Sequence, residues 1–199
     1  GRNFCNKIWN AYRLIRGWEV SAEVAQSEHS KLAAEWFDNK LSQTIETVDE
    51  HFSKFRLSDA LMTLYKFFWD DFCAWYLEVI KPEYGKPIDK VTYDATIVFF
   101  EKLLRLLHPI MPFITEELWQ NIEERKDGET IMLQPMPKAG EYSVETIHAF
   151  EQGVGAIASI RNIRQSKGLS PKEALTLQIK GAFPEKIVSV VKRMANLSE

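Results

Sequence analysis

Residues 92–125 have the sequence TYDATIVFFEKLLRLLHPIMPFITEELWQNIEER, and this stretch predicts the fold class. Apolar side chains recur at helical spacing from Ile97 to Leu107, and again at Leu118 and Ile122. Prolines at 109 and 112 separate the two runs, and proline both lacks the N–H that a helix needs and crowds the preceding turn. The stretch therefore predicts a helix from about residue 92 to 107, a break, and a shorter helix over 113–125.

Three further long segments carry a helical apolar stripe on either side of this pair. They are residues 30–52, residues 58–81 (ended by Pro82) and residues 143–167 (ended by Gly168). Long amphipathic helices of this kind are typical of an α-helical bundle, in which each helix buries its apolar stripe against its neighbours. We therefore predict a mainly α fold.

The pattern changes near the carboxyl end. Leu175, Leu177 and Ile179 alternate with polar residues, which predicts a strand, and Pro184 begins another helical segment. A second brief strand is expected at 131–133. We therefore expect a helical-bundle domain over residues 1–168, followed over 169–199 by the start of a small α/β unit that is truncated.

The composition is that of an ordinary soluble globular protein. Of 199 residues, 45% are hydrophobic and 27% charged, with a net charge of -3. Cys5 and Cys73 are far apart and form no Cys-x-x-Cys motif, so we expect neither disulfides nor a zinc site and predict a cytoplasmic protein. No signal peptide is recognisable, and no run approaches the ~20 apolar residues that span a bilayer, so no membrane partner is expected.

The first 18 residues depart from this acidic average. They contain four cations, Arg2, Lys7, Arg13 and Arg16, and no acidic residue, which leaves a net charge of -7 on the remainder. A short basic segment on an acidic body indicates a contact surface for an anion, and nucleic acid is the commonest large one.

Helical spacing divides this segment into two faces. Phe4, Ile8, Ala11, Tyr12 and Ile15 form the stripe that should be buried. The other face carries Arg2, Asn6, Trp9 and Arg13, with Asn10, Asn3 and Lys7 beside them. Flat rings, amides and cations are the groups with which proteins bind single-stranded RNA. The alternatives are that Trp9 packs on a neighbouring helix while the cations are simply solvated, or that the basic helix docks on an acidic protein.

A second basic run lies between residues 153 and 172. It contains Arg161, Arg164, Lys167 and Lys172 without an acidic residue, and the first three share one helix face. These cations could follow a phosphate backbone or offset the dipole at the helix carboxyl end, and the pattern leaves both interpretations open.

No catalytic constellation is recognisable. Glu145 and His148 have the Glu-x-x-His spacing of di-metal bundles, but a second such motif is missing, so we expect no metal. The residues from Gly153 to Ala158 match G-x-G-x-x-A, yet they lie in a predicted helix instead of following a strand. Small residues there more simply allow close helix packing.

Four segments resemble one family. Residues 2–13, RNFCNKIWNAYR, are similar to the helix that opens the anticodon-binding domain of valyl-tRNA synthetases, and residues 64–78, LYKFFWDDFCAWYLE, resemble the central helix of that domain. Residues 103–119 resemble the proline-broken helix pair shared by synthetases for branched aliphatic amino acids. Residues 160–164, with Pro171 and Lys172 after them, resemble the segment beyond the bundle. Ala74 departs from the family, which often has aspartate there.

The resemblance implies a non-catalytic part of a parent enzyme that activates valine with ATP, transfers it to tRNA and edits mischarged tRNA. The catalytic motifs of that enzyme are missing, so no cofactor is expected here, and ATP would belong to the parent. The implied partners are the tRNA(Val) anticodon stem-loop and the catalytic domain of the parent chain, and the protein should be monomeric. The implied tRNA-binding residues are Arg2, Asn6, Lys7, Trp9, Asn10, Arg13, Arg161 and Arg164. The alternatives are the isoleucyl enzyme's anticodon-binding domain or a helical protein-docking scaffold.

Overall fold

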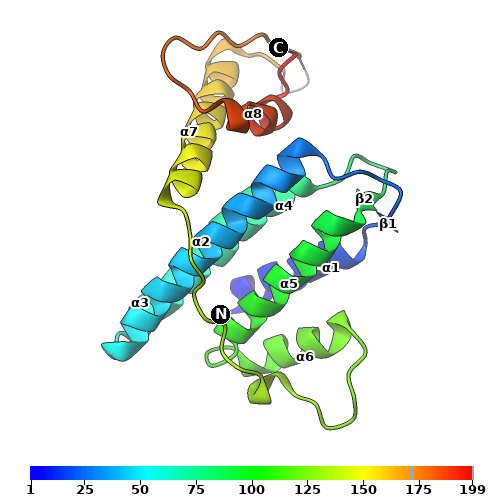
Figure 1. Ribbon diagram of the computed structural model, residues 1–199, viewed down its shortest axis with the longest axis vertical. Coiled ribbons are helices and arrows are strands. Elements are labelled where there is room, and N and C mark those ends of the chain that lie inside the picture. The colour runs from blue at the N-terminus through cyan, green and yellow to red at the C-terminus, as the bar shows by residue number, and fades with distance from the viewer. Residues whose placement is uncertain (171–172, 199) are drawn as a thin grey trace.

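The computed structural model describes residues 1–170 and 173–198 and shows a mainly α fold, as predicted (Figure 1). Pro171 and Lys172, which are part of the family resemblance, lie outside the described residues, and so does the last cation of the second basic run, which is Lys172. The α-helices are α1 (Arg2–Arg16), α2 (Glu28–Ser53), α3 (Leu57–Lys66), α4 (Leu77–Ile80), α5 (Lys90–Leu107), α6 (Pro112–Ile122), α7 (Val144–Lys167) and α8 (Val188–Ala195). The π-helix η1 (Phe67–Tyr76) joins α3 to α4, and η2 (Ile131–Leu133) and η3 (Glu185–Ile187) are 3-10 turns.

The bundle is built on the long helix α2. The segment α3–η1–α4 runs back along α2, and α5 packs beside both (Figure 1). Their shared core is aromatic: the buried ring of Phe37 lies 5.0 Å from that of Phe67, 4.8 Å from that of Tyr76 and 5.1 Å from that of Phe99. Helix α1 runs behind α5 in this view, and α6 lies at the opposite end of the molecule from α7 and α8 (Figure 1).

The proline break falls where the sequence predicts it. Helix α5 ends at Leu107 and α6 begins at Pro112. The corner between them is fixed by His108, whose Nδ1 shares a 2.7 Å hydrogen bond with Thr115 Oγ1. Thr115 in turn donates to the carbonyl of Met111 at 2.9 Å. These side-chain hydrogen bonds link the two sides of the corner at which the prolines interrupt the helical hydrogen bonds.

Both strand predictions are wrong. Residues 131–133 form the turn η2, in which Thr130 Oγ1 accepts a hydrogen bond from the Met132 amide. Residues 175–179 form no strand, and Leu175 only makes a single bridge with Leu197. The strands that the described residues do form are β1 (Val20–Ser21) and β2 (Ile88–Asp89), which pair in parallel. An alternating pattern becomes a strand only where a neighbouring segment pairs with it over several residues, and in the described part of the chain the pairing of 175–179 is limited to the bridge between Leu175 and Leu197.

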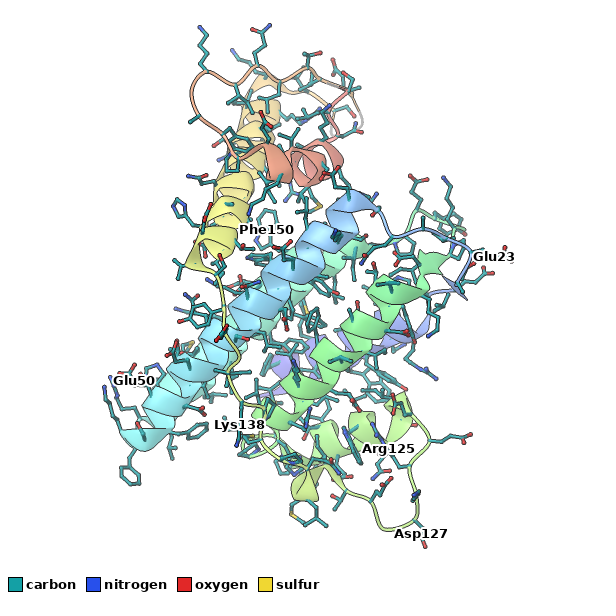
Figure 2. All side chains as sticks on the ribbon, in the orientation of Figure 1. Glu23, Glu50, Arg125, Asp127, Lys138 and Phe150 are labelled. Atoms are coloured by element: carbon teal, nitrogen blue, oxygen red, sulfur yellow. The ribbon has the colours of Figure 1, made fainter. Side chains whose placement is uncertain are left out.

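The carboxyl-terminal residues pack on the bundle through α7. Phe150 of α7 stacks on Trp36 of α2, with ring centroids 3.9 Å apart, at the position labelled in Figure 2. Helix α8 approaches α7 closely at Gly153, where an added Cβ would lie 2.8 Å from Ile187 Cγ1. The expectation that small residues permit close helix packing is thus confirmed at Gly153. The boundary between a bundle at 1–168 and a unit at 169–199 stays a prediction.

Asp71 on η1 lies near Lys40 of α2 and Glu151 of α7. Burial of its carboxyl group raises its pKa to about 6. The charged groups around it are Lys40, which opposes the rise, and Asp70 and Glu151, which add to it. The folded state therefore holds this proton more tightly than the unfolded state, in which the carboxyl has its ordinary pKa of 3.8. It follows that the ionisation of Asp71 lowers the free energy of unfolding as the pH rises from 3.8 to about 6. Above about pH 6 this loss of stability is complete.

We therefore expect Asp71→Asn to raise the free energy of unfolding at pH 8 by at most about 3 kcal/mol and to leave it nearly unchanged at pH 4. Urea unfolding at both pH values measures the effect. The exposed neighbour offers a matched control, because Asp70→Asn should change stability by less than about 0.5 kcal/mol. An equal gain from Asp71→Asn at both pH values would contradict the titration of this carboxyl.

Candidate nucleic-acid interface

Helix α1 has the two faces that its sequence predicts. Phe4, Ile8, Ala11 and Ile15 are buried, and Phe4 packs against the rings of Tyr65 and Phe68. On the opposite face Trp9 keeps 41% of its surface exposed. The polar residues of that face, Arg2, Asn6, Asn10 and Arg13, are exposed as well. The outward orientation of Trp9 and its neighbours is therefore confirmed, and the packing of Trp9 beneath another helix is not observed.

The cations of α1 have no acidic partners. Within residues 1–170 and 173–198, none of Arg2, Lys7, Arg13 and Arg16 forms an ion pair. Eight other cations of the described residues do form ion pairs, for example Lys40 with Glu151 at 2.7 Å and Lys90 with Asp94 at 2.6 Å. Unpaired cations on one helix face attract an extended anion, because no internal acid has to be displaced first.

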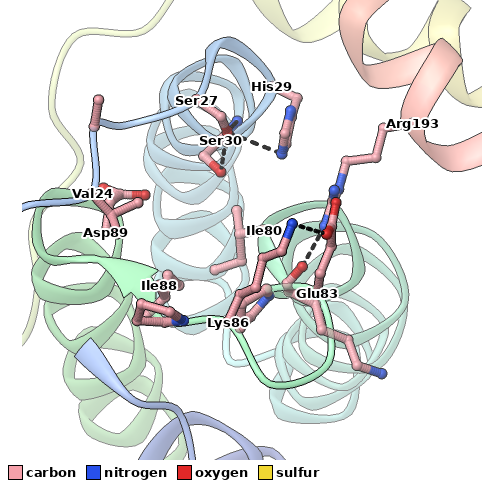
Figure 3. Close-up of a pocket in the computed structure, with 14 residues that line it drawn as sticks. Val24, Ser27, His29, Ser30, Ile80, Glu83, Lys86, Ile88, Asp89 and Arg193 are labelled. Carbon is pink, nitrogen blue, oxygen red and sulfur yellow. Dashed lines mark hydrogen bonds and ion pairs between the residues drawn. The ribbon is translucent and has the colours of Figure 1, made fainter. Parts of the chain in front are cut away.

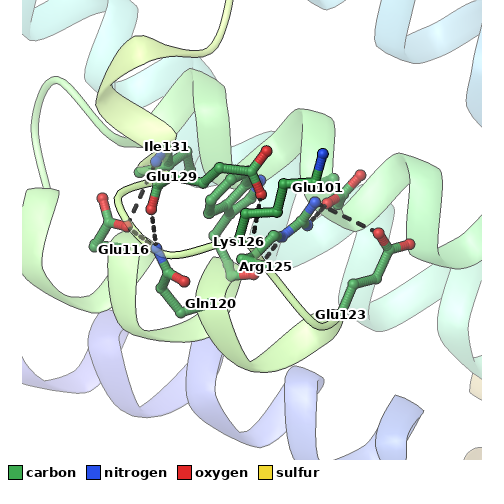
Figure 4. Close-up of polar contacts among 9 residues, drawn as sticks. Glu101, Glu116, Gln120, Glu123, Arg125, Lys126, Glu129 and Ile131 are labelled. Carbon is green, nitrogen blue, oxygen red and sulfur yellow. Dashed lines mark hydrogen bonds and ion pairs between the residues drawn. The ribbon is translucent and has the colours of Figure 1, made fainter.

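The two flanks of α1 differ in charge. On the α6 side, the Trp9 ring lies 5.9 Å from that of Tyr12, whose hydroxyl donates to the Asn121 carbonyl at 3.1 Å. Helix α6 and the loop after it expose several acids. Figure 4 shows Glu123 beside Arg125, which pairs with Glu101 and, at 3.4 Å, with Glu123, and it shows Glu129 beside Gln120. The α6 flank is therefore a poor path for phosphates.

The other flank carries an aromatic pair that the sequence analysis missed. Lys7 Nζ lies 5.0 Å from the centroid of the half-buried Trp69 ring on η1. Tyr65 stacks beside Trp69, with ring centroids 5.5 Å apart at an angle of 29°. The i, i+4 spacing of Tyr65 and Trp69 indicates that the two rings lie on one face of a helix. The sequence does not show that this face borders α1.

The second basic run does not form a phosphate surface as a whole. Arg164 is only 5% exposed, and its guanidinium donates to four backbone carbonyls, those of Ser170, Glu173, Ala195 and Asn196. A guanidinium used in this way cannot also bind RNA, so the predicted role of Arg164 is corrected to a structural one. Arg161 is exposed, donates to the Met194 carbonyl at 3.3 Å and lies 5.6 Å from the Trp75 ring centroid.

A pocket of about 160 Å³ lies between the start of α2 and the loop after α4 (Figure 3). Arg193 of α8 closes one side by donating to the Val79 carbonyl at 2.9 Å. Burial lowers the pKa of His29 to about 4, so its ring is neutral near pH 7. Three cations, Lys81, Lys86 and Arg193, line this space together with two acids, Glu83 and the buried Asp89. Lys86 pairs with Glu83 at 2.5 Å and Arg193 donates to a backbone carbonyl, so we interpret the pocket as a joint between α8 and the bundle.

The described residues offer little for catalysis or metal binding. Glu145 and His148 are exposed on α7, whereas a di-metal bundle needs them inside, and residues 1–170 and 173–198 contain no group of three potential metal ligands. Burial raises the pKa of Cys73 to about 12, so its thiol stays protonated near neutral pH. No helix in this part of the chain is long and apolar enough to cross a membrane.

A family comparison agrees with the helical architecture. The model of the family described as the anticodon-binding domain of tRNA ligase matches residues 34–179, so the chain belongs to this family of tRNA-ligase domains. Helix α1 precedes the matched range.

Curated proteins resemble the chain over its full length, α1 included. It is 52% identical over 198 residues to valine–tRNA ligase of Parabacteroides distasonis and 51% identical over 199 residues to that of Phocaeicola vulgatus, which is 100% of this chain and 23% of each relative. Valine–tRNA ligase of Fusobacterium nucleatum is 36% identical over 217 residues, covering 100% of this chain and 24% of that protein. The chain thus spans about a quarter of the length of these relatives.

Proposed function

We propose that this chain binds the anticodon stem-loop of tRNA(Val) as the non-catalytic anticodon-binding domain of a valine–tRNA ligase. The observation that carries the proposal is the outward face of α1, on which an exposed indole lies among amides and cations without acidic partners. Membership of the anticodon-binding family and the similarity to valine–tRNA ligases support it. The ligase reaction, from ATP, L-valine and tRNA(Val) to valyl-tRNA(Val), AMP and diphosphate, would be carried out by the rest of a longer cytoplasmic protein.

Each residue of the face has a role that its chemistry supplies. Trp9 offers a ring on which an unpaired base stacks, and Asn6 and Asn10 offer amides for base edges. Arg2, Lys7 and Arg13 bind phosphates, and Arg161 on α7 adds a more distant contact. The catalytic domain of the same polypeptide is the second partner, and the protein acts as a monomer.

The proposal is tested by titrating the chain with valine and isoleucine anticodon stem-loops at 50 and 200 mM salt. We expect tighter binding of the valine stem-loop. If about three phosphates are neutralised, the affinity should fall ~20-fold between the two salt concentrations, since each contact with a single strand contributes about -0.7 to the logarithmic slope. Equal binding of both RNAs would argue against anticodon reading, and preference for the isoleucine loop would favour the isoleucine enzyme. If the chain binds neither RNA, the remaining alternative is a helical scaffold that docks on another protein.

Trp9→Ala should weaken binding of the valine stem-loop about 5- to 100-fold, because a base–aromatic stack contributes ~1–3 kcal/mol. The melting temperature should change little, since the ring is largely exposed. Trp9→Phe should retain most of the affinity. Tyr84→Ala is the matched control, because Tyr84 is a fully exposed ring far from α1 in the chain, in the loop before β2. A lowered melting temperature with unchanged affinity would give Trp9 a structural role instead.

A further inference from the structure

The stacked pair Tyr65 and Trp69 lies along the η1 side of α1 and has no role in the packing of the core centre. Both rings are half-buried at the edge of the core, whereas Phe68 and Phe72 on the same segment are fully buried. The side chain placed over Trp69 is Lys7, a flexible chain that ends in a charge. An aromatic ring over which a flexible cation lies can exchange that cation for another flat or positive group.

The backbone of η1 helps to produce this arrangement. Trp69 lies inside a ten-residue π-helix, and π-helical turns occur mostly where a function offsets their cost. On α1, the edge that faces Trp69 carries Asn3, Lys7 and Asn10 at spacings of four and three residues, and both asparagines are exposed. A ring, an ammonium and amides therefore border the same side of α1.

The charges also favour this side over the α6 side. On the η1 side, α3 and η1 expose one cation, Lys66, and two acids, Asp59 and Asp70, of which only Asp70 is next to Trp69 in the chain. On the opposite flank, α6 and the residues after it expose Glu117, Glu123 and Glu124. A phosphate chain that crosses α1 meets less repulsion on the η1 side.

We propose that Trp69 is a second base-stacking platform, on which a base of the RNA loop stacks while Lys7 binds the adjoining phosphate. In the complex Lys7 leaves the ring, the base takes its place beside Tyr65, and Asn3 or Asn10 bonds the base edge. Trp9 and Trp69 then hold two bases of one loop on opposite sides of α1. The inference rests on the proposed function, because it assigns a further subsite to the same RNA.

The test uses the valine anticodon stem-loop and Trp69→Leu, which keeps an apolar side chain but removes the ring. We expect the affinity to fall about 5- to 100-fold. Trp69→Phe should stay within about threefold of the unchanged protein. Trp18→Leu is the matched control, because Trp18 is also half-buried but lies after the end of α1 and outside the contact between Lys7 and Trp69. Circular dichroism at the titration temperature confirms that each variant is folded.

A second measurement separates a lost stack from a general disturbance of the surface. Stem-loops with one loop base removed at a time are titrated against both the unchanged protein and Trp69→Leu. At one position, removal of the base should weaken binding to the unchanged protein and have no further effect on the variant. That position should differ from the one found in the same way for Trp9→Ala.

The outcomes distinguish this inference from the proposed function. If Trp9→Ala weakens binding and Trp69→Leu does not, the second platform is rejected and the anticodon-binding role stands. If Trp69→Leu weakens binding equally for every abasic RNA, its effect is structural and the platform is likewise rejected. If the unchanged chain binds no stem-loop at all, the proposed function itself fails.

Discussion

Replacing Arg164 by methionine is expected to lower the free energy of unfolding by about 3–5 kcal/mol, because several charge-assisted hydrogen bonds are lost together. The guanidinium is buried and donates to four carbonyls, at 2.9 Å to Ser170, 2.7 Å to Glu173, 2.9 Å to Ala195 and 3.1 Å to Asn196. These carbonyls belong to the segment after α7 and to the end of α8. The substitution should therefore release α8 first, with faster amide hydrogen exchange at 188–195 than in the core of α2.

Two variants sharpen the test of Arg164. Arg164→Lys should recover less than half of the loss, since a single ammonium cannot reproduce the planar donor fork. Arg161→Met should cost less than about 1 kcal/mol, because Arg161 is exposed and makes one hydrogen bond of 3.3 Å. If Arg164→Met and Arg161→Met were equally mild, the buried guanidinium would not be what holds α8 in place.

The second large effect is expected at Gly153, where α7 and α8 approach most closely. A Cβ on this residue would lie 2.8 Å from Ile187 Cγ1 and 3.5 Å from a Val191 methyl, so α8 has to move outward. Overpacking of this kind costs about 1–3 kcal/mol, against which alanine gains up to about 1 kcal/mol in helix propensity.

Gly155 supplies the comparison within the same helix. It has nothing within 4 Å of its added Cβ, so Gly155→Ala should stabilise the protein by up to about 1 kcal/mol. The free energies of unfolding of the two alanine variants, measured with urea, should therefore differ by about 1–3 kcal/mol, because the gain in helix propensity is common to both and only the overpacking cost remains. If Gly153→Ala and Gly155→Ala stabilised the protein equally, α8 could move away from α7 without a cost in free energy, which would contradict the prediction.

Local chemistry made much of the helical framework predictable. The break at Pro109 and Pro112 and the end of α7 at Gly168, whose φ of 66° suits glycine, depend on nearest neighbours in the chain. The buried stripe and exposed face of α1 follow from helical spacing alone. The residues that were misjudged depend on distant partners. Arg164 looks like a surface cation until carbonyls up to 32 residues away surround it.

The same reason explains the missing strands and the overlooked aromatic pair. Alternation at 175–179 is a local property, but a strand needs a neighbour, and the pairing of β1 with β2 joins residues almost seventy positions apart, Val20 with Ile88. Trp69 borders α1 because the π-helix changes the angular step along η1, which a pattern based on 3.6 residues per turn does not anticipate.

Helix α1 is fastened along its whole length: its apolar stripe is buried, Tyr12 ties it to α6, and the strand that follows it pairs with the residues that begin α5. A helix held in this way loses its conformational entropy during folding, before any RNA arrives. Association then orders the nucleotides and a few side chains instead of the helix itself. Such preorganisation raises affinity without adding contacts, and it lets a surface as small as one helix face select among short loops.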